Sequence, residues 1–368
     1  MRVLFFNEGN LGSQVMGQGQ LELAIRKGLG AEPGIDARFG GLSPIGTLEH
    51  AAAVRTFGPL ARTGLEFRAL RWHLIQAARA RRELALELEV WPADVVHMHS
   101  HSIGFLTGGS PQGSSLVLSV DATAHDWWAM PSSSLLAGDR ELALSPSRAL
   151  ERRALARADL VVAWTAWARR GVQRSSPAAN VVEIHPGLDL DLYRPAPRVE
   201  RPRPRLLFVG GRFLEKGGED LLAAVGERIG RDLELDVVTP AEVPARDGLR
   251  VHRLGPADPR LLELFQQADL LCLPTYGDAA PWVLVEAMAC GTPVLSTEVG
   301  GIPDLLDFGR AGLIVAPGDR RALGRAVDAV LGDGALQHKL AAAGRARCED
   351  HYDAERQTSR LFALMREL

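Results

Sequence analysis

Short apolar runs alternate with longer amphipathic stretches along most of this chain. The runs are rich in Val, Leu, Ile and Phe, and their apolar residues follow one another instead of alternating with polar ones. This pattern is typical of parallel strands that are buried on both faces, with helices in the intervening stretches. We predict strands over residues 2–7, 94–99, 115–121, 159–164 and 180–185, and then over residues 205–210, 233–238, 249–254, 269–274, 292–296 and 311–315.

A proline-rich segment separates the two sets of strands. Residues 186–205 contain five prolines and charges of both signs, a composition that disfavours regular structure. We therefore interpret this segment as a linker between two doubly wound α/β domains, each with its own parallel sheet. The length of 368 residues agrees, because a chain this long exceeds what one hydrophobic core usually serves.

Composition and charge exclude several classes of protein. With 46% hydrophobic and 24% charged residues and a net charge of −3, the chain is typical of globular proteins and offers no overall basic surface for nucleic acid. The first residues predict a strand rather than a signal peptide, and no apolar run reaches the roughly 18 residues that a membrane span needs. Cys272, Cys290 and Cys348 are widely spaced and fit neither a disulfide framework nor a zinc site. We therefore expect a cytoplasmic protein.

In open parallel sheets, ligands bind beyond the carboxyl ends of the strands, and two glycine-rich loops stand there. NEGNLGSQVMGQGQ, residues 7–20, follows the first strand. It either brings backbone N–H groups close to a phosphate or sugar or serves as a tight turn. GGRFLEKGGEDLL, residues 210–222, follows the first strand of the second domain. Its Arg212 and Lys216 can hold an anion between two cations, or they are solvated loop residues.

An isolated acidic residue in an apolar stretch is another candidate for ligand binding. Pro281 suits the first turn of a helix and Gly291 suits the position after its end, so we predict a helix over about residues 281–290. Within it Glu286 is the lone charged residue, and Asp278 stands just ahead of it. Burying an unpaired carboxylate costs several kcal/mol, so Glu286 either faces water or meets a ligand. Two carboxylates in one cleft are suited to accept hydrogen bonds from sugar hydroxyls.

These segments resemble a known family. GGRFLEKGGEDLL, the D-x7-E element DAAPWVLVE, its sequel AMACGTPVLSTEVGGIPDLL and AGLIVAPGD are similar, in this order, to the retaining GT-B glycosyltransferases of glycosyltransferase family 4. ADVVHMHS, ARADLVVAWT and IHPGLDLDLYRP extend the resemblance to the first half. It implies two Rossmann-like domains that face a cleft. Residues 1–187 would form the acceptor-side domain, with a final helix at residues 351–368 crossing back to it, and residues 188–350 the donor-binding domain.

The resemblance also implies an activity. A nucleoside-diphosphate sugar would donate its sugar to an acceptor hydroxyl with retention of configuration. No metal ion or other cofactor would be needed, because fixed cations stabilise the departing diphosphate. Arg212 and Lys216 would grip the diphosphate. Glu286 would take the ribose hydroxyls, and Asp278 hydroxyls of the transferred sugar. The implied donor site further comprises Gly12, Gly211, Leu254, Ala280, Trp282 and Val283.

Some positions depart from the family pattern. Asp278 replaces the first Glu of the family's E-x7-E, and Pro281 stands where the family often has glycine. Many relatives end the strand at residues 115–121 with a histidine near the reacting sugar, whereas this chain has Asp121 there and His125 four residues later. We favour Asp121, which could orient an acceptor hydroxyl, and keep His125 as the alternative.

Histidines and tryptophans of the first half add acceptor-side candidates. His97, His99 and His101 alternate at a strand end. We favour a polar wall of the acceptor cleft, with His99 as an acceptor-binding residue, over a metal site. Trp127 and Trp128 either stack on a sugar face or, as we expect for one or both of them, pack in the core.

The sequence does not determine whether the acceptor is a small molecule, a glycan or a lipid-linked sugar. The Arg-rich helix predicted at residues 65–84 could lie on an anionic membrane at its inner face, but we expect it to cover the first domain. Two alternatives to a transferase are a GT-B nucleotide-sugar epimerase and a non-catalytic nucleotide-sugar-binding subunit. The combination of Arg212, Lys216 and Glu286 favours an enzyme, because a scaffold without turnover has no need of it.

Overall fold

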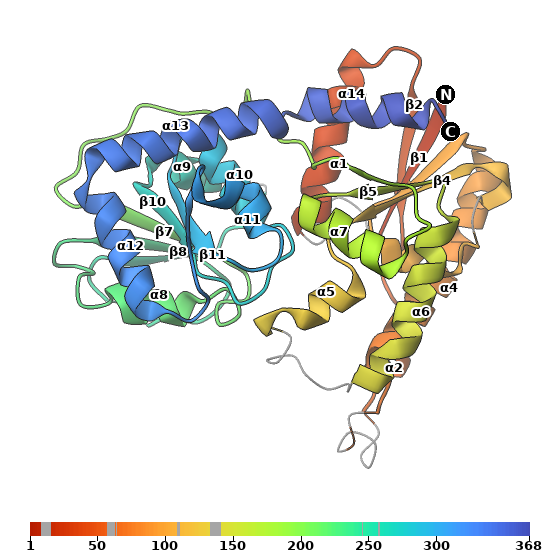
Figure 1. Cartoon of the computed structure of the whole chain (residues 1–368), viewed down its shortest axis with the longest axis horizontal. Helices are drawn as coiled ribbons and strands as arrows, with labels where there is room; N and C mark the ends of the chain where they lie inside the picture. The colour runs from red at the N-terminus through yellow and green to blue at the C-terminus, as the bar shows by residue number, and fades with distance from the viewer. Residues whose placement is uncertain are drawn as a thin grey trace. The chain divides into compact units, whose positions relative to one another are not determined.

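The computed structural model describes residues 1–8, 16–56, 63, 65–108, 111–132, 141–244, 246–256 and 258–368. Its contacts divide the chain into two compact units (Figure 1). The first unit comprises Met1–Ala129, Ser133–Gly187 and Glu355–Leu368, and the second comprises Met130–Ser132 and Leu188–Ala354. Among the helices described, none is both long and apolar enough to cross a membrane.

The first unit is built on a six-stranded parallel sheet with the order β2-β1-β3-β4-β5-β6. Its strands are β1 (Arg2–Asn7), β2 (Asp36–Gly41), β3 (Val95–Met98), β4 (Ser115–Val120), β5 (Leu160–Ala163) and β6 (Val181–Glu183). Its main helices are α1 (Met16–Gly28), α2 (Thr47–Val54), α4 (Arg68–Val90), α5 (Ala124–Ala129), α6 (Glu141–Arg157), α7 (Ala166–Ser175) and α14 (Ala354–Met365). The strand order reverses between β1 and β3, which is where an open α/β sheet forms its ligand crevice.

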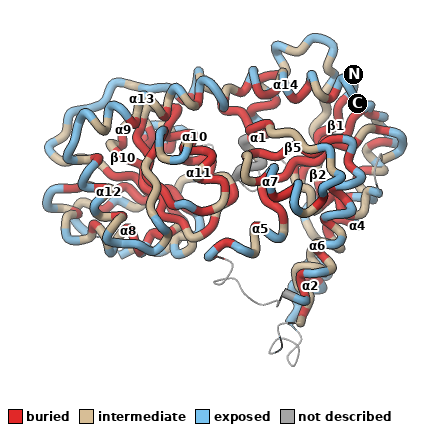
Figure 2. Tube along the Cα trace, in the orientation of Figure 1, coloured by how far each residue is buried: buried red, intermediate tan, exposed pale blue. Residues whose placement is uncertain are grey.

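Strand β1 shows why the sheet is encoded by continuous apolar runs. Leu4 and Phe6 belong to a core cluster that includes Leu84 of α4. Val3 and Phe5 belong to a second cluster, formed with residues of α1 and α14. Alternate residues of a strand point to opposite faces, so a strand covered on both faces must be apolar at every position. Figure 2 shows the resulting concentration of buried residues along the strands.

The second unit has a six-stranded parallel sheet with the order β12-β11-β10-β7-β8-β9. Its strands are β7 (Arg205–Val209), β8 (Glu234–Val238), β9 (Leu249–His252), β10 (Leu270–Leu273), β11 (Val294–Thr297) and β12 (Leu313–Val315). Its helices are α8 (Gly218–Val225), α9 (Pro259–Gln267), α10 (Trp282–Ala289), α11 (Ile302–Leu305), α12 (Arg320–Gly332) and α13 (Gly334–His351). Here the order reverses between β7 and β10, so the expected crevice lies beyond those two strands.

The predicted α/β class with two parallel sheets is confirmed, and all eleven predicted strands are present within two residues of their expected ends. The sequence did not predict β2, Asp36–Gly41. This strand reads DARFGG and lies at the edge of its sheet, half buried, so it carries no continuous apolar run. The helix predicted at residues 65–84 begins later, at Arg68, because Phe67 adopts a left-handed conformation with φ of 52°.

The last helix, α14, packs on the sheet of the first unit. Phe362 is fully buried there, with its ring centroid 6.1 Å from that of Phe5. Thr358 donates a hydrogen bond to the carbonyl of Ala24 in α1. The two helices approach so closely that a Cβ at Gly28 would lie 2.4 Å from the Thr358 Cβ, which requires glycine at that position.

We predict that Phe362→Ala lowers the free energy of unfolding of the first unit by about 3–5 kcal/mol, because it removes a buried aromatic ring and leaves a cavity. The control is Leu368→Ala in the same segment, where the side chain is 44% exposed and the expected change is below about 0.5 kcal/mol. Denaturant unfolding, followed by fluorescence of the tryptophans, measures both. Equal effects of the two substitutions would contradict the packing of α14 on β1.

Candidate active site

A tight turn after β7 positions Lys216. The side chain of Lys216 lies against Gly210, where a Cβ would approach the lysine Cβ to 2.9 Å. The next residue, Gly217, has φ of 76°, and a Cβ there would lie 2.0 Å from the carbonyl oxygen of Pro274. Glycine is therefore required at Gly217 for both its backbone conformation and its contact. The turn thereby brings the lysine to the loop that follows β10.

Lys216 forms an ion pair with Asp278, whose carboxylate Oδ2 accepts a hydrogen bond from the ammonium. The ammonium also donates to the carbonyl of Gly277 at 3.2 Å. The Lys216 and Asp278 side chains are 17% and 20% exposed, so the pair is only partly screened by water. The sequence predicted both residues for the donor site but assigned them to different parts of the ligand. The structure brings them into direct contact.

Arg212 has a partner that the sequence analysis missed. Its Nε lies 3.0 Å from Oε2 of Glu215, three residues on, and its side chain stays half exposed. Glu215 also ties the two loops together, because its carbonyl accepts hydrogen bonds from the Tyr276 amide at 2.9 Å and the Thr275 hydroxyl at 3.3 Å. An acid at i+3 of a basic residue is a recognisable pairing signal in sequence.

Glu286 stands on α10, in which every residue is buried. Pro281 is the N-cap and Gly291 follows the C-cap with φ of 72°, so the predicted helix is confirmed within one residue. The Glu286 side chain is buried, and desolvation raises its pKa to about 8. The carboxyl group is therefore protonated at neutral pH.

The other predicted donor residues lie at several places in the second unit. Gly211 is exposed in the turn after β7, and Ala280 is half buried in the loop after β10. Trp282 and Val283 begin α10 and are buried. Leu254 follows β9, which is separated from β7 by β8. Gly12 lies outside the described residues.

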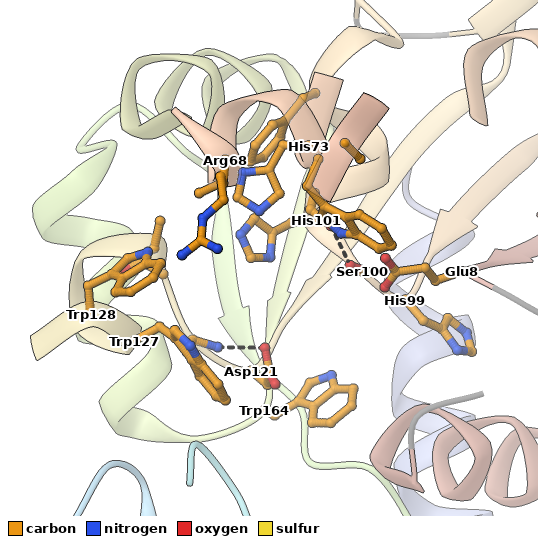
Figure 3. A pocket seen from close by; sticks show the side chains of 18 of the residues that line it. Glu8, Arg68, His73, His99, Ser100, His101, Asp121, Trp127, Trp128 and Trp164 are labelled. Atoms are coloured by element: carbon orange, nitrogen blue, oxygen red, sulfur yellow. Dashed lines mark hydrogen bonds between the residues drawn. The ribbon is translucent and has the colours of Figure 1, made fainter. Parts of the chain in front are cut away.

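A cavity of about 580 Å³ opens in the first unit beyond the carboxyl ends of β1, β3 and β4 (Figure 3). Helix α4 contributes a second wall, and the segment that contains α5 contributes a third. Most of the lining side chains are acidic, basic or aromatic, as the following residues show: Glu8, Arg68, Trp72, His73, His99, His101, Asp121, Trp127, Trp128 and Trp164. The cavity thus coincides with the strand-order reversal of its sheet.

The pockets show where Asp121, His125 and the two tryptophans lie, while the choice between Asp121 and His125 stays a prediction. Asp121 follows β4 and lines the cavity, with its Oδ1 accepting a hydrogen bond from the Ala122 amide at 2.8 Å. His125 is exposed and lines a different pocket, so it does not share the cavity with Asp121. The expectation that Trp127 and Trp128 pack in the core is wrong. Both are half buried and line the cavity, in the second half of the short helix α5.

The three alternating histidines have different surroundings. His97 is buried in the sheet, and its Nε2 lies 2.7 Å from the Ser119 hydroxyl. His99 lines the cavity although it is 3% exposed, and neither ring nitrogen has a hydrogen-bond partner in the described structure. Burial holds the pKa of His99 well below its usual value, so this ring is neutral. The described residues contain no group of three or more His, Cys, Asp or Glu suited to a metal ion.

His101 differs because it meets an acid. Its Nε2 lies 2.7 Å from Oε1 of Glu151 on α6, which also accepts a hydrogen bond from the Ala124 amide at 2.8 Å. Burial by itself would lower the pKa of His101, but the hydrogen bond and charge of Glu151 outweigh it and raise the pKa. Neighbouring His73 has its pKa lowered to about 4 by burial and by that positive charge. Nothing in the sequence links His101 to an acid fifty residues away, so this pair was missed.

Comparisons with known proteins point to one group. The family model "Glycosyl transferases group 1" matches residues 203–333, and "Glycosyltransferase Family 4" matches residues 43–192. The D-inositol 3-phosphate glycosyltransferase of Nocardia farcinica is 31% identical over 272 residues, 65% of this chain and 59% of that protein. The enzyme of that name from Mycobacterium marinum is 29% identical, over 68% of this chain and 59% of its own length. The chain thus spans about three fifths of these curated relatives.

Solved structures share the fold. Sucrose-phosphate synthase from Thermosynechococcus elongatus aligns with a TM-score of 0.74 and 20% identity, covering 100% of this chain and 98% of that one. Anabaena HepE in complex with UDP and glucose aligns with a TM-score of 0.68 and 15% identity over the full length of both chains. At these identities the likeness establishes the two-domain architecture.

We predict that Glu286 makes stability fall as pH rises. The unfolded carboxyl loses its proton near pH 4.5, whereas the folded one keeps it until about pH 8. The stabilising effect of the neutral form is therefore fully present below pH 4.5 and is lost between pH 4.5 and 8. Glu286→Gln cannot ionise and should abolish this loss, which amounts to roughly 3–5 kcal/mol. Urea unfolding at pH 5.5 and pH 8.5 tests it. Parallel pH profiles for the two proteins would contradict it.

Proposed function

We propose that the chain is a family 4 glycosyltransferase of the GT-B type, which transfers a sugar from a nucleoside-diphosphate sugar to an acceptor hydroxyl, because glycosyltransferase family models match residues 43–192 and 203–333. We propose further that the transfer retains the anomeric configuration and needs no metal ion. The observation that carries the proposal is the contact of Lys216 with Asp278 at the strand-order reversal of the second unit. A cation and a hydrogen-bond acceptor stand there side by side, as a diphosphate joined to a sugar requires.

The ion pair gives Lys216 and Asp278 a defined role in donor binding. Without a donor, each side chain neutralises the other and both stay oriented. The diphosphate carries two negative charges against the single charge of the carboxylate and would draw the ammonium to itself. Asp278 would then accept hydrogen bonds from hydroxyls of the sugar. The donor thus replaces one ion pair by two interactions, and neither group is left unpaired in a partly buried site.

Leaving-group stabilisation follows from the same geometry. When the bond between the anomeric carbon and the diphosphate breaks, negative charge builds on phosphate oxygens and the sugar becomes positively polarised. A fixed ammonium at the diphosphate lowers that barrier, and Arg212 on the same turn can add a second cation because half of its surface is open. These two residues supply the charge that a divalent ion would otherwise provide.

Glu286 would hold the ribose. Its carboxyl group is neutral at neutral pH, and a neutral carboxyl both donates and accepts hydrogen bonds. A vicinal diol offers matching donors and acceptors without a charge that would have to be buried. This chemistry suits a ribose better than a phosphate.

The cavity of the first unit is our proposed acceptor site. Its volume falls within the range of small-molecule pockets, roughly 300–1,000 Å³. Trp127 and Trp164 present ring surfaces on which a sugar or cyclitol can stack, and Asp121 and Glu8 bring acceptor oxygens for hydroxyl groups (Figure 3). The name of the curated relatives makes D-inositol 3-phosphate the first acceptor to try.

We predict that Lys216→Met lowers kcat by about a hundredfold or more while the fold stays intact, because the leaving group loses its cation. The donor is first identified by thermal shift with UDP, GDP, ADP, CDP and dTDP sugars, and nucleotide release is then measured with and without acceptor. Lys339→Met, an exposed lysine on α13, is the matched control and should leave kcat unchanged. Normal turnover of Lys216→Met would contradict the role of Lys216 in stabilising the leaving group. Nucleotide release without any acceptor would instead favour an epimerase, and binding without turnover a non-catalytic subunit.

We also predict that the enzyme retains its turnover after treatment with EDTA and passage into metal-free buffer, because Lys216 and Arg212 supply the required charge. The measurement compares kcat before treatment, after treatment, and after addition of Mg²⁺ or Mn²⁺. A loss of activity that either metal restores would show that the cations of the turn are insufficient.

A further inference from the structure

The side chain of Tyr276 links three segments of the second unit. Tyr276 stands in the loop after β10, two residues before Asp278. Its hydroxyl donates a hydrogen bond to Oδ2 of Asp220, in the first turn of α8, at 2.5 Å. Oδ1 of Asp220 accepts another from Nε of Arg320, the first residue of α12, at 2.6 Å. Asp220 therefore joins the loop after β10 to two helices that pack against each other (Figure 1).

The hydroxyl of Tyr276 is enclosed where it meets Asp220. Asp220 is 5% exposed, so few water molecules can compete for its carboxylate. On another side, a Cβ at Gly318 would lie 3.1 Å from the hydroxyl oxygen, and Gly318 has φ of 80°. The hydrogen bond to Asp220 raises the pKa of Tyr276, so the hydroxyl keeps its proton at neutral pH. A hydrogen bond from a hydroxyl to a carboxylate is stronger than one between neutral groups.

The backbone of Tyr276 makes a second connection, to the turn that carries Lys216. Its amide donates to the carbonyl of Glu215 at 2.9 Å, directly before Lys216 in the chain. The next residue, Gly277, has the carbonyl that accepts from the Lys216 ammonium at 3.2 Å. Asp278 follows and forms the ion pair. One residue thus attaches the loop twice, by its amide to the turn and by its hydroxyl to the helix that follows the turn.

We propose that Tyr276 is a positioning residue that holds Asp278 in place against Lys216. The proposal rests on the proposed function, in which these two side chains hold the donor. Groups that stabilise a transition state have to be held within a fraction of an ångström, and supporting hydrogen bonds supply that precision. Without its hydroxyl, residue 276 keeps only the backbone attachment, and the loop gains freedom at the position of Asp278.

The test compares Tyr276→Phe with the matched control Tyr352→Phe. Tyr352 is a fully buried residue of the same unit, and its hydroxyl donates to the carbonyl of Leu305 at 3.3 Å. Each variant loses one tyrosine hydroxyl that donates a hydrogen bond, so a general loss of stability appears in both. Hydrogen–deuterium exchange, measured by mass spectrometry, reports on the loop at residues 274–281 and the turn at residues 210–218 without any substrate.

We expect exchange in these two segments to be about tenfold or more faster in Tyr276→Phe and unchanged in Tyr352→Phe. We also expect kcat of Tyr276→Phe to fall by about tenfold or more while KM for the donor changes by less than about threefold, because a misplaced group weakens transition-state binding most. The control keeps kcat within about twofold of the wild type. Asp220→Ala removes the acceptor of the same hydrogen bond and replaces Tyr276→Phe if that variant fails to fold.

A double-mutant cycle shows whether the effect passes through Asp278. When Asp278→Asn has already lowered kcat, adding Tyr276→Phe should lower it by less than about twofold more. Unchanged exchange in the two segments, unchanged kcat, or fully additive losses in the cycle would overturn the proposal. Failure of the proposed function gives a different result: faster exchange in Tyr276→Phe, but no sugar transfer by the wild type from any donor, would support the positioning of Asp278 and refute the transfer reaction.

Discussion

Both sheets are parallel and covered by helices on both faces, and this burial determines where polar chemistry can stand. Most interior strand positions are therefore apolar, with exceptions such as the hydrogen-bonded His97 and Ser119, and charged side chains collect where the strands end. In each unit the strand order reverses once, between β1 and β3 and between β7 and β10, and the helices part at that point. The cavity beside Asp121 and the Lys216–Asp278 pair lie at these two reversals. The candidate sites thus follow from the sheet topology.

The ionisable side chains of the candidate sites differ in their surroundings, and the surroundings affect their charge. Lys216 and Asp278 are oriented by the ion pair that they form with each other. Glu286 lies in a helix whose residues are all buried, and desolvation raises its pKa to about 8. Burial likewise holds the pKa of His99 well below its usual value, whereas the hydrogen bond and charge of Glu151 raise the pKa of His101. Two opposing effects account for these pKa shifts: burial disfavours the charged form of a group, and an opposite charge within hydrogen-bond reach favours it.

The sequence predicted those parts of the molecule that local pattern determines. The strands at 2–7 and 269–274 are continuous apolar runs, and α10 is bounded by Pro281 and Gly291. The prediction from sequence was wrong or incomplete where a structure depends on contacts between residues that are far apart in the chain. Strand β2 has few apolar residues because it is an edge strand beside β1. Trp127 and Trp128 have large apolar side chains of the kind that fill cores, but they line a cavity.

Pairings across the chain were equally hidden. Lys216 and Asp278 are separated by sixty-two residues, and His101 and Glu151 by fifty. Single-sequence reasoning places such groups at strand ends or on helices, but it does not give their distances. Pairing at short range, as between Arg212 and Glu215, is by contrast open to inspection of the sequence.

The position of α14 bears on how the chain folds during synthesis. The sheet of the first unit is complete in sequence by Glu183, yet part of its hydrophobic layer, including Phe362 and Met365, comes from the last turns of the last helix. When only the first half of the chain has left the ribosome, the apolar surface of β1 on which α14 packs is still exposed. That unit therefore finishes its core only after the ribosome has synthesised the whole of the second unit.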